Sequence, residues 1–406
     1  MHATSGRFVL VFNGEIYNHL ALRAELAAAG AAPSWRGHAD TETLLAAIDH
    51  WGIDGALDRI IGMFAFALWD ARRRCLHLVR DRLGEKPLYY GIVGRNFVFA
   101  SELKAIEAFP GFAGELDRYA IAAYLRFGYV PAPRSIWQGI SKLPPGTVLS
   151  LPAVGTATAA SPRPYWSLAA VTTRGRPAIG RQAAADGLEH LLGEVVRSQM
   201  LSDVPLGVFL SGGIDSSLVA ALMRQHGSGP VRSFSIGFTD PRLDESAHAR
   251  AVAAHLGTAH TEFMVSPREA LDVVGILPEV YDEPFADSSQ IPSILLSRLT
   301  RAEVTVALSG DGGDEMFAGY NRHIFAARLW NGAARLPRSA RRGLAVLSSA
   351  LQRLTTGQRL AALKRLSARS ELPITTFDRL AKFGDAIGRS DDFAAFYDRL
   401  VATWYD

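Results

Sequence analysis

The sequence predicts a mixed α/β protein with an antiparallel sandwich in its first part and a doubly wound parallel sheet with additional helices in its second. Short apolar segments separated by turns fill the chain up to about residue 150, as is typical of antiparallel sheets. Residues 151–180 are rich in Ala, Thr, Pro and Gly, a composition that favours a linker. Beyond them apolar strands alternate with helical segments, as in parallel sheets.

Periodicity places the individual elements within these parts. In the first part, residues 64–69 and 96–100 are expected to be strands and residues 41–51 a helix. In the second part, apolar strands are expected to end near Leu210, Gly237 and Leu308. We therefore predict one domain over residues 1–150, a linker over 151–180 and a second domain over 181–406, with helices in the latter at 183–200, 218–225 and 245–256.

Composition narrows the class of protein. The 406 residues are 48% hydrophobic and carry a formal net charge of only +3. No apolar run approaches the roughly 20 residues of a membrane span, and no recognised nucleic-acid motif is present. A single cysteine excludes an internal disulfide and fits a reducing compartment. These features predict a soluble cytoplasmic protein that binds neither membranes nor nucleic acid.

The most informative motif is SGGIDSS, from Ser211 to Ser217, between an apolar strand and an apolar helix. Gly212 and Gly213 allow backbone N–H groups to approach a polyphosphate closely. Ser216 and Ser217 add hydroxyl donors where the helix begins. A carboxylate among phosphates, here Asp215, is repulsive unless Mg²⁺ lies between them. The alternative is a tight turn that caps a helix without any ligand. The length of the motif favours an ATP site with Mg²⁺.

A second loop, from Leu308 to Glu315, again carries an apolar strand into Ser-Gly, followed by acidic residues. Because the carboxyl ends of parallel strands lie at one edge of a sheet, we expect the two loops to converge there. Asp314 is the predicted partner of Asp215 on the metal, and Asp311 is expected to act on the substrate or the α-phosphate. A solvated turn is the alternative. It is disfavoured because clustered carboxylates repel one another unless a cation compensates.

No lysine follows the glycines, so the motif does not fit a Walker A loop. It resembles instead the PP-loop of ATP pyrophosphatases, and the two loops together resemble the synthetase half of glutamine-hydrolysing asparagine synthetases. That resemblance implies that Asp215 and Asp314 hold Mg²⁺ and that Asp311 is catalytic. It also implies ATP contacts at Leu210, Ser211, Gly212, Gly213, Asp215, Ser216, Ser217, Ile236, Ser309 and Gly310.

The first part of the chain resembles the glutaminase half of the same family. Three stretches match it in order, NGEIYN from Asn13, HADTE from His38 and RDRLGEKPLYY from Arg80. Each stretch taken alone has an ordinary structural explanation. An Asn-Gly pair is common in turns, and an Asp before Thr and Glu is a common helix cap. The resemblance implies an Ntn-amidotransferase-like sandwich. In it Asn13 and Gly14 are catalytic through an oxyanion hole, and glutamine is bound by Asn13, Gly14, Glu15 and Asp40.

The chain departs from the family at both ends. The family's glutaminase attacks glutamine with an N-terminal cysteine, whereas this chain begins Met1-His2. Its one cysteine, Cys75, is expected to be a half-buried strand residue. We therefore expect that the chain, incomplete in its first domain, does not hydrolyse glutamine. At the other end Lys364 and Lys382 lack the surroundings of the family's later catalytic lysine, and the second domain is expected to be incomplete too.

The resemblance implies a ligase of amino-acid biosynthesis. Aspartate would be amidated to asparagine through aspartyl-AMP, with ammonia or, in the intact family, glutamine as nitrogen donor. It also implies a homodimer. Three alternatives stay open: a relative that uses the activated carboxylate as β-lactam synthetases do, a relative that amidates another acid, and an inactive fragment. The acceptor acid is not fixed by a fold and a PP-loop.

Overall fold

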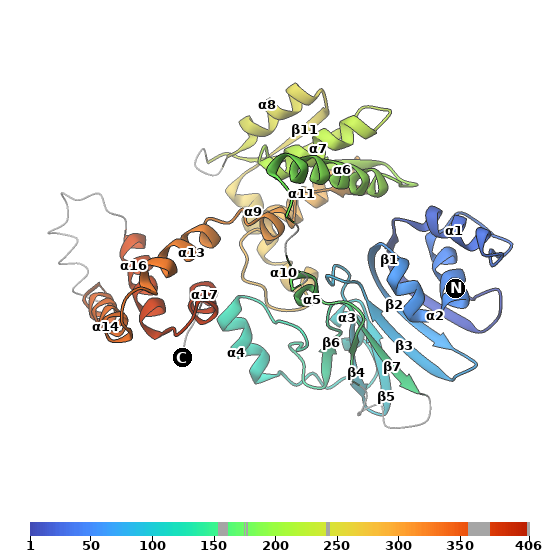
Figure 1. Ribbon diagram of the computed structural model, residues 1–406, viewed down its shortest axis with the longest axis horizontal. Helices are drawn as coiled ribbons and strands as arrows, with labels where there is room; N and C mark the ends of the chain where they lie inside the picture. Colours follow the sequence, from blue (N-terminus) through green and yellow to red (C-terminus); the bar gives the residue numbers. More distant parts are fainter. Residues whose placement is uncertain (153–160, 174, 176–177, 241–243, 356–373, 404–406) are drawn as a thin grey trace. The chain divides into compact units, whose positions relative to one another are not determined.

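The computed structural model describes residues 1–152, 161–173, 175, 178–240, 244–355 and 374–403 (Figure 1). The chain forms two compact units. Unit 1 comprises Met1–Tyr124 and Tyr129–Gly310, and unit 2 comprises Leu125–Gly128 and Asp311–Asp406. Lys364 lies outside the described residues.

Unit 1 begins with two antiparallel sheets. A five-stranded sheet has the order β1-β2-β3-β7-β8 and a three-stranded sheet the order β5-β4-β6. The strands of the larger sheet are β1 (Phe8–Ile16), β2 (Gly62–Asp70), β3 (Cys75–Arg80), β7 (Thr147–Pro152) and β8 (Arg163–Pro164). Those of the smaller are β4 (Tyr89–Val93), β5 (Asn96–Ala100) and β6 (Ile140–Lys142). The helices of this region are α1 (His19–Ala28), α2 (Asp40–Arg59), α3 (Leu103–Glu107), α4 (Arg118–Phe127) and α5 (Leu168–Thr172).

Alternation along β2 explains how these layers stack. Phe64, Phe66 and Leu68 point to one face of the larger sheet, where they pack in one core with residues of α1 and α2. The intervening Ala65 and Ala67 point to the other face and share a core with the smaller sheet. Because successive side chains of a strand point to opposite faces, one strand serves both layers. The outer face of the smaller sheet is covered by residues of α3 and α4.

Asp81 holds together the RDRLGEKPLYY stretch that follows β3. Its carboxylate is 1% exposed, yet it accepts five backbone N–H bonds at 2.6–3.2 Å, from Phe64, Leu83, Gly84, Glu85 and Lys86. The guanidinium of the preceding Arg80 donates to three carbonyl oxygens, including that of Leu143 before β7. The charged side chains of Arg80 and Asp81 therefore form hydrogen bonds with backbone groups of this turn that have no partners in a β-sheet.

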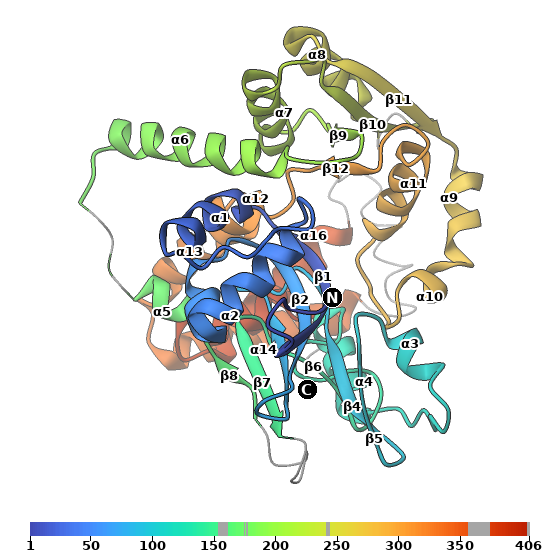
Figure 2. The ribbon, with the colours of Figure 1, turned by 90° about the vertical axis from the view of Figure 1, so that its right-hand side faces the viewer.

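The rest of unit 1 is built on a parallel sheet of order β11-β10-β9-β12. Helices cover both of its faces (Figure 2). Residues of α6, α7 and α8 share one core with β9, and α11 packs on β10 beside α9. The strands are β9 (Leu206–Phe209), β10 (Arg232–Phe238), β11 (Ala259–Val265) and β12 (Val306–Leu308). The helices are α6 (Arg181–Gln199), α7 (Ile214–His226), α8 (Ser246–Leu256), α9 (Pro267–Val274), α10 (Leu277–Val280) and α11 (Gln290–Thr300).

Unit 2 is helical where it is described. Its helices are α12 (Gly313–Phe317), α13 (Asn321–Ala333), α14 (Arg338–Thr355), α16 (Ile374–Arg389) and α17 (Phe393–Val401). A small core joins α13, α16 and α17 around Ala326, Ala386 and Phe396, with the Trp330 ring stacked on Phe396. Lys382 lies in α16 and donates to the carbonyl oxygen of Ala402 at 2.9 Å.

The mixed α/β class and the parallel sheet predicted from the sequence are confirmed. The helix expected at 41–51 lies within α2, and the strands expected at 64–69 and 96–100 are β2 and β5. The three strands expected to end near Leu210, Gly237 and Leu308 are β9, β10 and β12. Within the described part of the chain, no helix is both long and apolar enough to cross a membrane.

Replacing Asp81 with alanine is expected to lower the free energy of unfolding by at least about 3 kcal/mol. The substitution leaves several buried N–H donors unpaired, and each such donor costs roughly 1–3 kcal/mol. Chemical denaturation of wild type and variant measures the difference. The control is Asp58→Ala, an exposed residue of α2, for which a change within about 0.5 kcal/mol is expected. A loss no larger than that of the control would contradict the role given to Asp81.

Candidate active site

The SGGIDSS loop connects β9 to α7 at the carboxyl edge of the parallel sheet. The N–H of Leu210 still belongs to the sheet and donates to Phe234 at 2.8 Å. Gly213 is the N-cap of α7 and provides no side-chain cap for the first turn. The first N–H groups of a helix have no partner within the helix. A glycine N-cap therefore leaves them for a ligand, and the positive end of the helix dipole favours an anion there.

The three hydroxyl groups of the loop differ in what they contact. Ser216 is 8% exposed, and its Oγ contacts Ser211 Oγ at 2.9 Å and accepts from the Ser211 N–H at 3.2 Å. It thereby braces the loop from inside. Ser211 Oγ in turn accepts from the Gly213 N–H at 3.2 Å. Ser217 Oγ is buried and has no hydrogen-bond partner. The loop conformation is therefore fixed by serine contacts before any ligand binds.

Glycines allow two other segments to come close to this loop. A Cβ atom on Gly212, whose φ is +79°, would lie 2.6 Å from the backbone of His248 in α8. A Cβ atom on Gly310 would lie 2.7 Å from the backbone nitrogen of Ser216 and 3.0 Å from the carbonyl carbon of Asp215. Such separations exclude any side chain unless the backbone shifts. The sequence prediction that the Ser309-Gly310 end of β12 converges with the SGGIDSS loop agrees with this packing.

Strand register explains the convergence. Val306–Leu308 of β12 pair in parallel with Leu206–Val208 of β9, so Ser309 and Gly310 continue alongside the end of β9. On the other side of β9, strand β10 is paired with β9 from Arg232 to Phe234 and then continues unpaired with β9 as far as Phe238. Ile236 consequently extends past the end of β9, at the same edge as the loop. Residues Leu210, Ile236 and Gly310 thus come from three neighbouring strands and meet at one edge.

The predicted acidic residues lie in both units. Asp215 is in the first turn of α7, whereas Asp311 and Asp314 belong to unit 2. Asp314 lies in the first turn of α12 beside Gly319, where a Cβ atom would fall 1.9 Å from its Oδ1. Within the described residues, no three His, Cys, Asp or Glu side chains are grouped to hold a metal ion. One carboxylate such as Asp215 still fits Mg²⁺, which usually binds through one or two carboxylates plus phosphate oxygens.

A second group of predicted residues lies on β1. Asn13 and Glu15 share one face of the strand, and Asn13 Nδ2 donates to Ser101 Oγ at 3.1 Å. Gly14 faces the opposite way, where a Cβ atom would lie 2.2 Å from the carbonyl oxygen of Met63. Asp40 Oδ2 accepts from the Ile16 N–H at 2.8 Å at the end of the strand. Burial, reinforced by the charge of Asp40, raises the pKa of the Glu15 carboxyl.

Comparison with protein families assigns both regions. A model described as "Asparagine synthase" matches residues 187–400, and a model described as "Glutamine amidotransferase domain" matches residues 1–166. The chain belongs to the asparagine synthase family. The family resemblance inferred from the two loops is therefore confirmed. Below, residues 1–166 are called the amidotransferase region.

Individual relatives agree with this assignment. A putative asparagine synthetase [glutamine-hydrolyzing] 2 of Methanocaldococcus jannaschii is 34% identical over 324 residues, covering 79% of this chain and 60% of the relative. Asparagine synthetase [glutamine-hydrolyzing] 1 of Bacillus subtilis is 35% identical over 315 residues, covering 77% and 48%. A putative asparagine synthetase [glutamine-hydrolyzing] of Mycobacterium bovis is 36% identical over 365 residues, covering 87% and 54%. The chain thus spans about half the length of the curated relatives it matches.

Residues that support Asp40 in this asparagine synthase family member were not predicted from the sequence. Arg23 of α1 donates to Thr43 Oγ1 and to the carbonyl oxygens of Gly37 and Ala39, at 2.8–3.1 Å. The Glu42 carboxylate accepts from the N–H groups of Arg36 and Gly37. These contacts fix the residues on both sides of Asp40. The residues around Asp40 carry no signal for Arg23, which comes from another helix.

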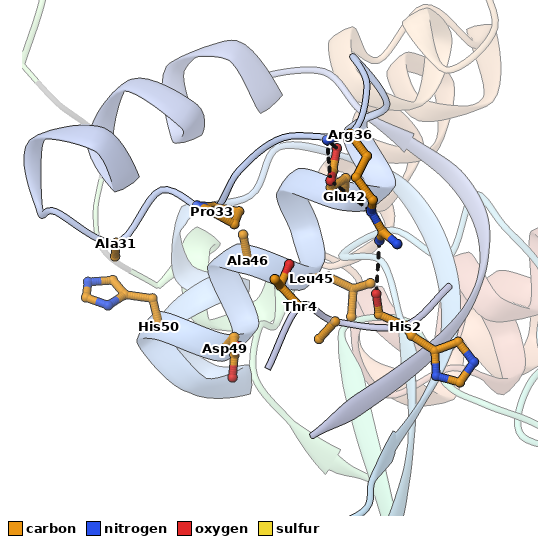
Figure 3. Close-up of a pocket in the computed structure, with 11 residues that line it drawn as sticks. His2, Thr4, Ala31, Pro33, Arg36, Glu42, Leu45, Ala46, Asp49 and His50 are labelled. Atoms are coloured by element: carbon orange, nitrogen blue, oxygen red, sulfur yellow. Dashed lines mark hydrogen bonds and ion pairs between the residues drawn. The ribbon is translucent and has the colours of Figure 1, made fainter. Parts of the chain in front are cut away.

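A pocket of about 310 Å³ is lined in part by Arg36 and Glu42 (Figure 3). It is bordered by α2 and by the first residues of the chain, and Arg36 crosses it to donate to the His2 carbonyl oxygen at 3.1 Å. Its lining does not include Asn13, Gly14, Glu15 or Asp40. The pocket is therefore separate from the predicted glutamine-binding residues.

Cys75 is the first residue of β3, half-buried, as the sequence predicted. Burial raises the pKa of its thiol. Because the thiolate is the nucleophilic form, a raised pKa makes the thiol less reactive. Cys75 is thus a strand residue without the surroundings of a nucleophile.

Gly310→Ala is expected to weaken ATP binding at least about tenfold and to lower stability by roughly 1–3 kcal/mol, since overpacking forces the backbone to move. Isothermal titration with a non-hydrolysable ATP analogue and thermal unfolding measure the two effects. Gly229→Ala is the matched control, because a Cβ atom there meets nothing within 4 Å. Equal affinity in both variants would mean that Gly310 does not border the nucleotide.

Glu15→Gln is expected to keep or raise stability at pH 7, with no gain below pH 4.5. The raised pKa of Glu15 means that the folded protein binds this proton more tightly than the unfolded chain, whose value is near 4.5. Stability from this carboxyl is therefore present at low pH and is lost as pH rises through the folded pKa. Urea unfolding between pH 4 and 8 tests this, with the exposed Glu115→Gln as control. If Glu15→Gln were less stable than wild type at pH 7 but not at low pH, the raised pKa of Glu15 would be contradicted.

Proposed function

We propose that the chain activates the side-chain carboxylate of aspartate with ATP and passes it to ammonia, giving asparagine. The observation that carries this proposal is the glycine-capped SGGIDSS loop with Gly310 packed against it, in a chain that belongs to the asparagine synthase family. The ATP contacts would be Leu210, Ser211, Gly212, Gly213, Asp215, Ser216, Ser217, Ile236, Ser309 and Gly310. Of these, Ser216 would act mainly by bracing the loop.

In the first step a carboxylate oxygen of aspartate attacks the α-phosphorus of ATP. The bond from the α-phosphorus to the bridging oxygen breaks, and pyrophosphate leaves with the electron pair. The free N–H groups at the start of α7 are oriented toward the charge that develops on the leaving group. Asp215 and Asp314 would be the residues that hold Mg²⁺, which would neutralise that charge. Asp311 would act at the aspartyl-AMP.

In the second step ammonia attacks the activated carbonyl carbon and AMP leaves, while the nitrogen loses a proton. In the amidotransferase region, Asn13 and Gly14 would form the oxyanion hole and, with Glu15 and Asp40, bind glutamine. The fixed position of Asp40 beside Ile16 supports that assignment. Ammonia is the nitrogen donor that we propose for this chain, and glutamine is the donor that we propose for the family.

The finer organisation is part of the same proposal. Residues 1–150 would be an Ntn-type glutaminase domain, residues 151–180 a linker and residues 181–406 a PP-loop synthetase domain. The protein would work in the cytoplasm as a homodimer. The antiparallel sandwich flanked by helices and the parallel sheet with helices on both faces support the two domain types.

Pyrophosphate release measured with ATP, ammonium and each candidate acid tests the function. Release that depends on aspartate, with AMP and asparagine formed in equal amounts, is expected. If pyrophosphate is released with a different acid and not with aspartate, that acid is the acceptor. Absence of acid-dependent release, with correctly folded protein, would support the inactive-fragment alternative.

Asp215→Ala is expected to reduce pyrophosphate formation by at least about 100-fold, because the triphosphate loses its metal contact in the loop. The assay is run across a range of Mg²⁺ concentrations, and the apparent affinity for Mg²⁺ is expected to fall. Asp272→Ala, on the exposed surface of α9, is the control. Activity in Asp215→Ala equal to that of the control would remove Asp215 from the metal site.

A further inference from the structure

Two consecutive carboxylates, Asp282 and Glu283, lie in the connection between α10 and α11 and have no part in the proposed chemistry. Both reach into the amidotransferase region. Asp282 Oδ2 accepts from the Leu103 N–H at 2.5 Å, and its Oδ1 pairs with Lys104 Nζ at 2.7 Å. Figure 2 shows this connection beside α3.

Glu283 repeats the pattern one residue later. Its Oε1 accepts from the Ile136 N–H at 2.8 Å, and its Oε2 pairs with Lys142 Nζ. Each carboxylate thus binds one ammonium group and one backbone N–H of the amidotransferase region. Backbone N–H groups fix direction as well as distance, so the two residues define both where and how this region is held.

These contacts are largely shielded from water. The Asp282 and Glu283 side chains are 9% and 10% exposed, and Lys142 is 15% exposed. Lys104, at 44%, is the exposed partner. Lys142 Nζ also lies 5.9 Å from the Tyr89 ring centroid and donates to the Val130 carbonyl oxygen. Burial, with the two carboxylates, raises the pKa of the Tyr89 hydroxyl. An ion pair in such surroundings is weakly screened by salt.

The same connection leads to the carboxyl edge of the parallel sheet. The carbonyl oxygen of Glu303, just after α11, accepts from Arg232 at the start of β10, so α11 ends at the amino edge. An 11-residue helix spans about 16 Å. Since α11 packs on β10, its first residue, Gln290, lies toward the carboxyl edge. Asp282 and Glu283 therefore hold the amidotransferase region to the edge that carries the SGGIDSS loop.

We propose that Asp282 and Glu283 form a clamp that couples the carboxyl edge of the parallel sheet to the amidotransferase region. They are positioning residues, which keep the region proposed to bind glutamine in register with the edge proposed to bind ATP. The coupling to catalysis rests on the proposed function, whereas the clamp itself rests on the contacts. Occupation of the edge by ATP then tightens the backbone at Leu103 and Ile136, because a ligand suppresses local opening of the segments linked to its site.

Amide hydrogen exchange on the whole chain, with and without ATP and Mg²⁺, tests this. In wild type, ATP is expected to slow exchange of peptides covering residues 101–107 and 134–142. In Glu283→Gln and Asp282→Asn, exchange there is expected to be about tenfold faster and insensitive to ATP, while exchange of residues 208–220 still responds. Glu279→Gln, an exposed residue of α10, is expected to behave as wild type.

A double-mutant cycle separates the clamp from simple packing. Lys142→Met alone leaves Glu283 unpaired, so combining it with Glu283→Gln is expected to restore part of the lost protection. Strictly additive effects would overturn the clamp, as would ATP-linked protection that persists unchanged in Glu283→Gln. If these variants fail to fold, Lys104→Met at the exposed partner provides the same comparison for Asp282. If ATP does not bind to the wild-type protein, the proposed function is wrong. The double-mutant cycle measured without nucleotide would still show whether the clamp exists.

Discussion

The close approach of Gly310 to the SGGIDSS loop is the constraint on which the candidate ATP site depends. It exists because β12 pairs in parallel with β9, so that two loops distant in sequence leave the sheet side by side. Only glycine fits where a Cβ atom would lie 2.7 Å from the Ser216 nitrogen. Together with the glycine N-cap of α7, this packing presents backbone N–H groups rather than side chains to a ligand. Such a surface suits a polyphosphate, whose charge is spread over many oxygens.

Short-range patterns in the sequence were sufficient for the elements and for the edge of the sheet at which the site lies. Alternating apolar residues identify β2 and β5, and the strand–glycine–helix order identifies β9 and α7. The convergence of the Leu210, Ile236 and Gly310 segments followed from a general property of parallel sheets. Glu15 of β1 and Asp40 of α2 are close enough for the charge of Asp40 to affect the pKa of Glu15.

Contacts made by tertiary structure could not be predicted in this way. The bonds between the buried Ser216 and Ser211, which brace the loop, are not visible in the sequence. Arg23 supports the Asp40 segment from a separate helix. The Asp282-Glu283 pair suggested no partner, because Lys104 and Lys142 are about 140 to 180 residues earlier in the chain. Sequence spacing cannot reveal such pairs, since they depend on how sheets and helices pack.

The proposed mechanism requires that the aspartate carboxylate becomes bonded to the α-phosphorus of ATP. The most direct measurement uses aspartate labelled with ¹⁸O in its side-chain carboxylate, with ATP and ammonium. One labelled oxygen is expected to be transferred to the phosphate of AMP. Label found in inorganic phosphate, with ADP as the nucleotide product, would contradict it.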